Sequence, residues 1–256
     1  MEKNTFIRLL ILFISFPLFA QQINTNIPVS DTEYQALVDF YKAMGESNWS
    51  NKWNTKENNL HEVTWYGVTV ENGHVTAINL NNTSNIAGAI PASFGNLKYL
   101  RSLALYGGSY SKDLSYSDLS TLSELENLEY LDLRSCKIKG SLPASWSKLK
   151  KLNALHLNSN SISSLPEEFG EIENLVTLDL SYNELKTLPA SMGNLSYLAT
   201  LNLSYNQLEV LPKEFENLNA LKTLQLNNNK ISDIKGLLKS QVYINLNTQT
   251  LNMEKF

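Results

Sequence analysis

The chain has 256 residues, of which 43% are hydrophobic, and its 21 basic and 25 acidic side chains give a formal net charge of -4. The charges are scattered along the sequence, so no basic patch indicates binding to nucleic acid or to an anionic membrane surface. Cys136 is the single cysteine. An intramolecular disulfide is therefore excluded, and the hydrophobic core must hold the fold together.

Residues 1–20 have the three-part layout of a secretory signal peptide. A short basic segment precedes an apolar run over residues 9–19, and the small residue Ala20 comes before two glutamines. The apolar run is shorter than the roughly 20 residues that a membrane-spanning helix needs. We therefore expect cleavage after Ala20, export to the periplasm or the extracellular space, and a mature chain that is not inserted in a membrane.

The segment that follows is expected to form an amino-terminal cap. Ser30 and Glu33 match a capping box, and apolar residues recur at helical spacing as far as Gly45, which predicts an amphipathic helix. Asn72-Gly73 lies between two β-rich runs and predicts a hairpin turn. Tryptophans suit the core of this cap better than a binding platform, and three occur in it. They are Trp49, Trp53 and Trp65.

One sequence unit recurs through the rest of the chain, and its copies at Leu152, Leu175 and Leu198 lie 23 residues apart. In each copy, apolar and polar residues first alternate, as in a short strand with one buried face. A single unit cannot bury its own leucines, so successive units must stack into a solenoid with a continuous core. Seven copies begin at Val75, Leu100, Leu128, Leu152, Leu175, Leu198 and Leu221.

This unit resembles the leucine-rich-repeat family over roughly residues 75–246. The resemblance implies an α/β repeat solenoid, a curved horseshoe segment with parallel strands on its concave face. The cap is similar to that of plant-type extracellular leucine-rich repeats but lacks their paired cysteines, so tryptophan packing should replace disulfides. We divide the chain into a signal peptide (1–20), a cap (21–74), seven repeats (75–241) and a closing strand with a tail (242–256).

An asparagine follows the strand in four of the repeats. Its amide offers donors and an acceptor, so stacked copies should form a ladder that satisfies the backbone of the turns. Cys136 occupies this position in its own repeat, and we interpret it as a small buried substitute rather than a nucleophile. Upstream, Gly108 and the segment 83–85 replace the asparagine. The four asparagines are Asn160, Asn183, Asn206 and Asn229.

The residues between the core leucines should point onto the concave face. Tyrosines and amides dominate there, which suits recognition of a protein, with a glycan as the alternative. We expect a non-catalytic, monomeric binding module without a cofactor, and we expect Tyr130→Ala or Arg134→Ala to weaken binding while folding stays intact. The predicted contacts are Tyr106, Tyr130, Asp132, Arg134, His156, Asp179, Tyr182 and Tyr205.

Asp132, His156 and Asp179 fall at equivalent positions of three successive strands, about 4.8 Å apart. The two carboxylates are expected to raise the pKa of the imidazole. A metal site or an acid–base pair is conceivable, but aspartate at this position is common in the family, so contact or structural roles fit better. The sequence has no nucleophile elbow, phosphate loop or metalloprotease helix. A self-associating structural or adhesion component remains the alternative to a binding module.

The second repeat is longer than the others, because Leu128 follows Leu100 by 28 residues. The excess lies in residues 106–117, which contain three tyrosines and two glycines. Insertions in a solenoid map to loops, often at the binding face, but surface loops also accept extra residues at little cost. The segment is therefore either a loop that closes one side of the binding face or tolerated drift.

Overall fold

The computed structural model describes residues 28–55, 63–106, 112–232 and 242–246. The predicted signal peptide lies outside these residues, as does Gly108. Among the described residues, no helix is long and apolar enough to cross a membrane.

The amino-terminal end of the solenoid is closed by helix α1 (Asp31–Ala43) and a hairpin of β1 (Val68–Glu71) and β2 (His74–Asn79). Ser30 Oγ accepts a hydrogen bond from the backbone N–H of Glu33 at 3.3 Å, so the predicted capping box starts the helix. The three cap tryptophans are buried, and the ring of Trp53 stacks on that of Trp65 with centroids 5.0 Å apart. The helix, the hairpin and the tryptophan core of the cap are confirmed.

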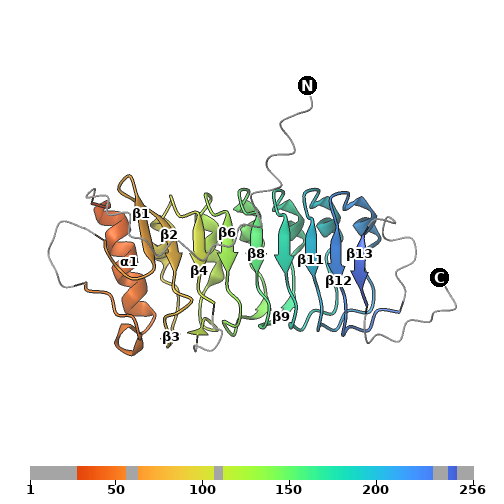
Figure 1. The fold of residues 1–256 in the computed structure, drawn as a ribbon, viewed down its shortest axis with the longest axis horizontal. Helices are drawn as coiled ribbons and strands as arrows, with labels where there is room; N and C mark the ends of the chain where they lie inside the picture. Colours follow the sequence, from red (N-terminus) through yellow and green to blue (C-terminus); the bar gives the residue numbers. More distant parts are fainter. Residues whose placement is uncertain (1–27, 56–62, 107–111, 233–241, 247–256) are drawn as a thin grey trace, which may run out of the picture.

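The described repeats form one sheet whose strands lie in a row from the cap to the carboxyl end (Figure 1). Every neighbour from β2 onward is parallel, and the central leucines of adjacent strands are in register, as with Leu155 and Leu178. Each strand of this row after β2 is three residues long and has a buried leucine, or in β13 a partly buried isoleucine, at its centre. After β2 the row contains β4 (Ser102–Ala104), β6 (Tyr130–Asp132), β8 (Ala154–His156), β10 (Thr177–Asp179), β11 (Thr200–Asn202), β12 (Thr223–Gln225) and β13 (Tyr243–Asn245).

The outer side of the solenoid consists of short 3-10 helices, most of which begin directly after a proline. The fixed φ of proline suits the first turn, and its missing N–H would be unsatisfied there in any case. Gly170 and Gly193 allow these helices to stack, because a Cβ at either position would meet a backbone oxygen of the next repeat, at 2.1 and 2.4 Å. The helices are η2 (Ala92–Asn96), η3 (Leu119–Glu124), η4 (Ala144–Lys148), η5 (Glu167–Glu171), η6 (Ala190–Asn194) and η7 (Lys213–Asn217), and a further 3-10 helix, η1 (Glu46–Asn48), follows α1 in the cap.

Two further pairs of short parallel strands lie beyond the turns that end the main strands. The pair β7 (Lys139–Ser141) and β9 (Ser161–Ser164) joins two middle repeats. The pair β3 (Ile86–Ala87) and β5 (Lys112–Asp113) joins two earlier ones. Part of the long second repeat is therefore a paired strand rather than a loop, while its residues 107–111 lie outside the described part of the chain.

The asparagine ladder is confirmed. Asn183 is representative: its Nδ2 donates to the carbonyl oxygens of Leu157 and Leu180 at 3.0 Å, and its Oδ1 accepts from the backbone N–H of Ile162 at 3.0 Å. Two of these three partners belong to the preceding repeat. The amide thus joins each turn to its neighbour through groups that burial would otherwise leave unpaired.

The repeats without asparagine use other donors at the same turns. The Sγ of Cys136 is fully buried and donates to the carbonyl oxygen of Leu105 at 3.1 Å, so its structural role is confirmed. One repeat earlier, the buried ammonium group of Lys112 donates to the carbonyl oxygen of Thr83 at 2.8 Å. Burial lowers the pKa of Lys112 from 10.5 to about 8, although Cys136 and Asp132 partly oppose the shift.

Candidate functional site

Asp132 and Arg134 form the centre of a polar cluster at the end of β6. Arg134 holds the carboxylate with two hydrogen bonds, from Nε to Oδ1 at 2.8 Å and from Nη2 to Oδ2 at 2.6 Å. The side chain of Asp132 is fully buried, whereas that of Arg134 is 33% exposed. The prediction that Asp132 is an open contact residue is therefore wrong. The carboxylate lies beneath the arginine and fixes its orientation.

Tyr106 packs against the other side of the guanidinium group. The Cζ of Arg134 lies 4.5 Å from the centroid of the Tyr106 ring, within the range of a cation–π contact. The hydrogen bond to Asp132 raises the pKa of Arg134 above its ordinary value. Residues of two successive repeats thus present a permanent positive charge in one orientation.

Tyr130 and His156 continue this cluster along the sheet. The hydroxyl of Tyr130 lies 3.4 Å from Oδ2 of Asp132, and burial raises the pKa of Tyr130 to about 12, so the phenol stays protonated. Its ring centroid lies 5.6 Å from that of His156. We call these five residues the sheet-face cluster: Tyr106, Tyr130, Asp132, Arg134 and His156.

The protonation of His156 differs from the sequence-based expectation. Its pKa is lowered from 6.5, first because the ring is buried and also because Arg134 repels a second positive charge. Asp132 and Asp179 act in the opposite direction but do not outweigh burial. The predicted rise in the pKa of His156 is wrong. The spacing of residues along the strands reveals the two carboxylates, but it does not reveal how far the ring is buried or that Arg134 neutralises Asp132.

Asp179 lies on the next strand, in register with His156, but its hydrogen bonds are made within its own repeat. Its Oδ1 accepts hydrogen bonds from the backbone N–H of Ser181 at 2.9 Å and from the hydroxyl of Ser181 at 2.6 Å. Within the described residues, no group of three or more His, Cys, Asp and Glu side chains is placed to hold a metal ion. The two aspartates beside His156 are each engaged by their own repeat.

Tyr182 and Tyr205 lie in the turns after β10 and β11 rather than on the strands. Each has a left-handed backbone, with φ 55°, and comes directly before a ladder asparagine. Their rings stack with centroids 4.0 Å apart and planes inclined by 10°. The eight predicted contacts therefore fall into three places: the sheet-face cluster, Asp179 on the strand next to it, and this pair at the edge of the sheet.

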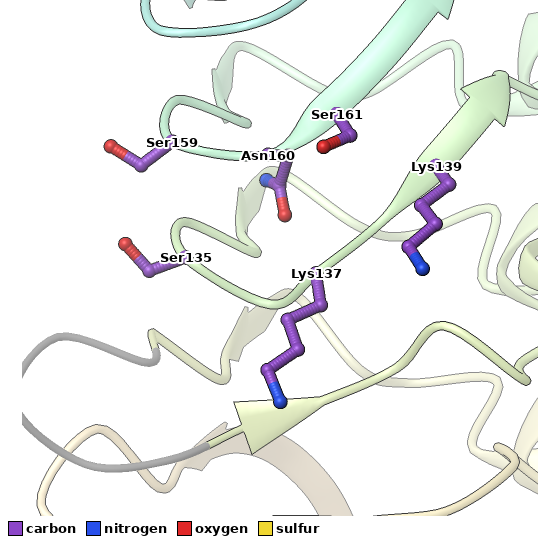
Figure 2. A pocket seen from close by; sticks show the side chains of 6 residues that line it. All are labelled: Ser135, Lys137, Lys139, Ser159, Asn160 and Ser161. Carbon is purple, nitrogen blue, oxygen red and sulfur yellow. The ribbon is translucent and has the colours of Figure 1, made fainter.

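Sequence reasoning missed a hollow on the same edge. It has a volume of 330 Å³ and lies between the turns of two middle repeats (Figure 2). One pattern in the sequence could have pointed to it. Serines occupy the same position of two consecutive turns, and two lysines follow the first of these serines. The lining residues are Ser135, Lys137, Lys139, Ser159, Asn160 and Ser161.

Similarities to other proteins agree with this architecture. A receptor-like protein of Arabidopsis thaliana, Receptor-like protein 39, is 33% identical over 102 residues, which cover 31% of this chain and only 12% of that protein. Among solved structures, a plant ice-binding protein has a TM-score of 0.71 at 24% identity, over 87% of this chain and 73% of that one, which shows a shared fold alone. The plant peptide hormone receptor RGFR1 in complex with RGF2 has a TM-score of 0.55 at 28% identity, over 74% of this chain and 38% of that one.

Two family models match the sequence itself. A leucine-rich repeat region matches residues 78–204, and a model of two leucine-rich repeats matches residues 198–239. Together they extend from 78 to 239, well over half of the chain, and they coincide with the stacked repeats of the sheet. The protein belongs to the leucine-rich-repeat family.

Proposed function

We propose that this protein is an exported, non-catalytic binding module that recognises a protein or peptide on the concave face of its sheet. The family is generally a binding scaffold, and the similarity to a peptide hormone receptor in complex supports a peptide or protein as the partner class. The signal-peptide pattern of residues 1–20 supports export. The module acts as a monomer.

The observation that carries this proposal is the orientation of Arg134. Arginine and tyrosine are the residues that most often dominate protein interfaces, above all when they are packed near the centre of the interface. Here Asp132 holds the guanidinium group by two hydrogen bonds and Tyr106 supports it from the other side. A partner would not have to order this side chain on binding, which lowers the entropic cost of association.

Site-specific photo-crosslinking tests the proposed face. A photoreactive residue replaces Tyr106 in one variant and, as a matched control, Lys213 on the outer helix η7 in another. We expect the variant at position 106 to crosslink one protein from the secreted fraction of the producing cells, with no such adduct at position 213. Equal adducts at both positions, or an adduct at 213 alone, would contradict the proposal.

Affinity measurements with the captured partner then test the individual residues. Tyr106→Leu and His156→Gln both leave the Asp132–Arg134 pair in place, and each should weaken binding by about 1–3 kcal/mol. Titration calorimetry gives the affinities, and melting curves show that the variants remain folded. Unchanged affinity in both variants would place the contact elsewhere.

Mass spectrometry of the exported protein tests processing separately. The expected amino terminus is Gln21, directly after the predicted cleavage site. A protein recovered outside the cell that still contains residues 1–20 would show that this segment is not a cleaved signal.

A further inference from the structure

Two tyrosines occupy turn positions that short polar residues fill in the neighbouring repeats. In five consecutive repeats, the residue directly before the ladder position has a left-handed backbone, with φ between 54° and 61°. Serine or asparagine fills three of these positions, at Ser135, Ser159 and Asn228, and Tyr182 and Tyr205 fill the other two. A left-handed backbone is unfavourable for a bulky residue, and residues kept in such conformations concentrate at functional sites. The turn itself does not require tyrosine, so the two side chains indicate a role beyond folding.

The backbone of the two turns holds the tyrosines at a fixed spacing. Tyr182 donates its backbone N–H to the carbonyl oxygen of Ser204 at 2.9 Å, and Asn183 donates its backbone N–H to that of Tyr205 at 3.2 Å. The strands before the turns, β10 and β11, pair in parallel register. The ladder residues Asn183 and Asn206 follow directly, and each bonds to a carbonyl oxygen of the preceding repeat. The main chain therefore sets the distance between the two tyrosines.

The two side chains lie face to face with their hydroxyl groups at the same end. The ring centroids are 4.0 Å apart, and the ring planes are inclined by only 10°. A side-chain hydrogen bond with Tyr205 raises the pKa of Tyr182 above its ordinary value, so Tyr182 is a neutral phenol at neutral pH. Because parallel rings with hydrogen-bonded hydroxyls are aligned head to head, the ring carbons beside one hydroxyl lie next to those beside the other. The exposed fractions, 51% for Tyr182 and 41% for Tyr205, leave both side chains open to an oxidant.

Two phenols with adjacent ortho carbons are suited to oxidative coupling. Removal of one hydrogen atom from each hydroxyl gives two phenoxyl radicals, whose unpaired electrons are shared between the oxygen and the ortho and para ring carbons. The para carbon of tyrosine is already bonded to Cβ, so a carbon–carbon bond forms between two ortho carbons. Each of these carbons then passes its hydrogen to the oxygen, which restores both phenols. Hydrogen peroxide takes up the two hydrogen atoms removed at the start and becomes two molecules of water.

We propose that Tyr182 and Tyr205 form a modification site, at which hydrogen peroxide and a haem peroxidase produce an intrachain dityrosine crosslink. The crosslink joins two successive repeats, because Tyr205 follows Tyr182 by 23 residues. Cys136 is the single cysteine, so the chain has no disulfide with which to join its own repeats. Dityrosine would act as a disulfide does, since a covalent link restricts the unfolded chain more than the folded one. The encounter with the oxidant rests on the proposed export, whereas the stacking of the rings does not.

Treatment of the dilute, full mature chain with hydrogen peroxide and a haem peroxidase tests the coupling. The monomer should lose two hydrogen atoms in its intact mass and gain the blue fluorescence of dityrosine. Peroxide without the peroxidase is the control for direct oxidation and should produce neither change. Covalent dimers as the only crosslinked product, or a monomer that keeps both hydrogen atoms, would overturn the proposal.

Three phenylalanine variants locate the crosslink. Tyr182→Phe and Tyr205→Phe each keep an aromatic ring in the turn but remove the phenol, so the intrachain product should be lost in both. Tyr197→Phe is the matched control and should retain the product, because Tyr197 is 60% exposed but, within the described part of the chain, no ring stacks on it. Tyr197 and Tyr205 fall on one tryptic peptide, residues 187–213, so the variants make an assignment that the peptide mass alone does not. Product in either variant of the pair, or its loss in Tyr197→Phe, would refute the proposed site.

Melting curves test the consequence for stability and verify that the variants fold. The crosslinked monomer should unfold at a higher temperature than the untreated protein, because the link limits the freedom of the unfolded chain. Tyr182→Phe, treated in the same way, controls for oxidation elsewhere and should show no such rise. An unchanged or lower melting temperature of the crosslinked monomer would contradict the stabilising role. None of these results bears on a partner at the sheet-face cluster, which contains neither Tyr182 nor Tyr205.

Discussion

From Asn160 onward, a neutral amide joins each turn to the preceding repeat, whereas the repeats before it use the thiol of Cys136 and the ammonium group of Lys112 at the same turns. In both regions, these side chains donate hydrogen bonds to buried backbone carbonyl groups in the turns that follow the strands. The amide needs no charge to do so, but the ammonium group must lose part of its hydration. The stability of the regular repeats should therefore be insensitive to pH, and that of the earlier repeats should depend on it.

The same contrast extends to the proposed binding face. Asp132, Arg134 and His156 are ionisable and partly or fully buried, and they lie in the repeats next to Lys112, whose pKa already reflects the charge of Asp132. The corresponding positions of later repeats carry short polar side chains such as Asn202 and Ser204, and Oδ1 of Asn202 accepts a hydrogen bond from the backbone N–H of Ser204. The earlier, irregular repeats thus contain both the buried charges that stabilise the fold and the side chains that we propose bind a partner. Substitutions can separate the effect on stability from the effect on binding.

The largest effect is expected from Arg134→Ala. Removal of the guanidinium group leaves the carboxylate of Asp132 buried without its charge partner, which should lower the free energy of unfolding by about 3 kcal/mol. This corrects the expectation that Arg134→Ala would leave folding intact. Urea denaturation measures the loss.

A second substitution controls for the buried charge. Asp132→Asn in the Arg134→Ala background removes that charge and should restore part of the lost stability. No recovery, or an initial loss below about 1 kcal/mol, would show that Arg134 does not compensate a buried carboxylate.

In the regular repeats, Asn183→Ala should lower the free energy of unfolding by about 1–3 kcal/mol, because it leaves buried turn groups unpaired. Asn202→Ala is the matched control, since the hydrogen bond that its Oδ1 accepts at 3.1 Å comes from the N–H of Ser204 in its own turn, and it should have the smaller effect. Denaturation at pH 6 and pH 9 should give the same loss for Asn183→Ala. A loss that varies with pH would undermine the contrast between the neutral and the charged region.

Lys112→Met isolates the charged turn. The unfolded chain binds the lysine proton up to about pH 10.5, whereas the folded protein releases it near pH 8, so between these values the unfolded state holds more protons and wild-type stability rises with pH. The variant lacks this contribution, so the deficit of the variant relative to wild type should grow from pH 8 to pH 10.5 and stay constant below pH 8. Melting temperatures across this range provide the measurement. A constant deficit would mean that the ammonium group is not desolvated.

Features that recur at the same position of each repeat could be predicted from the sequence, whereas features outside this pattern could not. The cap helix, the hairpin, the register of the leucines and the asparagine ladder all follow from local spacing, because each repeat meets its neighbours in the same way. Lys112 could not be identified as a ladder substitute, since it reaches the turn from the excess residues of the long repeat, where no periodic position marks it. The burial of Asp132 was also hidden, because it depends on Arg134 folding back over its own strand.

The candidate site was predictable in part for the same reason. Spacing placed Asp132, His156 and Asp179 on neighbouring strands in register, as found. It could not reveal that the carboxylates are already engaged by Arg134 and Ser181, since these contacts depend on side-chain conformations. The left-handed backbone at Tyr182 could not be predicted, because no glycine marks this position in the sequence.

The smallest effect is expected from His156→Gln, and it decides between burial and neighbouring charge as the main influence on this imidazole. The folded-state pKa lies below the unfolded value of 6.5, so between the two the unfolded chain binds more protons, and wild-type stability falls as the pH falls below 6.5. Glutamine does not titrate, so the stability difference between wild type and variant should shift in favour of the variant as the solution is acidified from pH 7 to pH 5. Had the two aspartates dominated, the difference would shift in favour of wild type. Urea midpoints at several pH values, with an NMR titration of the ring protons, distinguish the two cases by sign alone. A shift toward wild type would mean that Asp132 acts on His156 more strongly than its pairing with Arg134 allows.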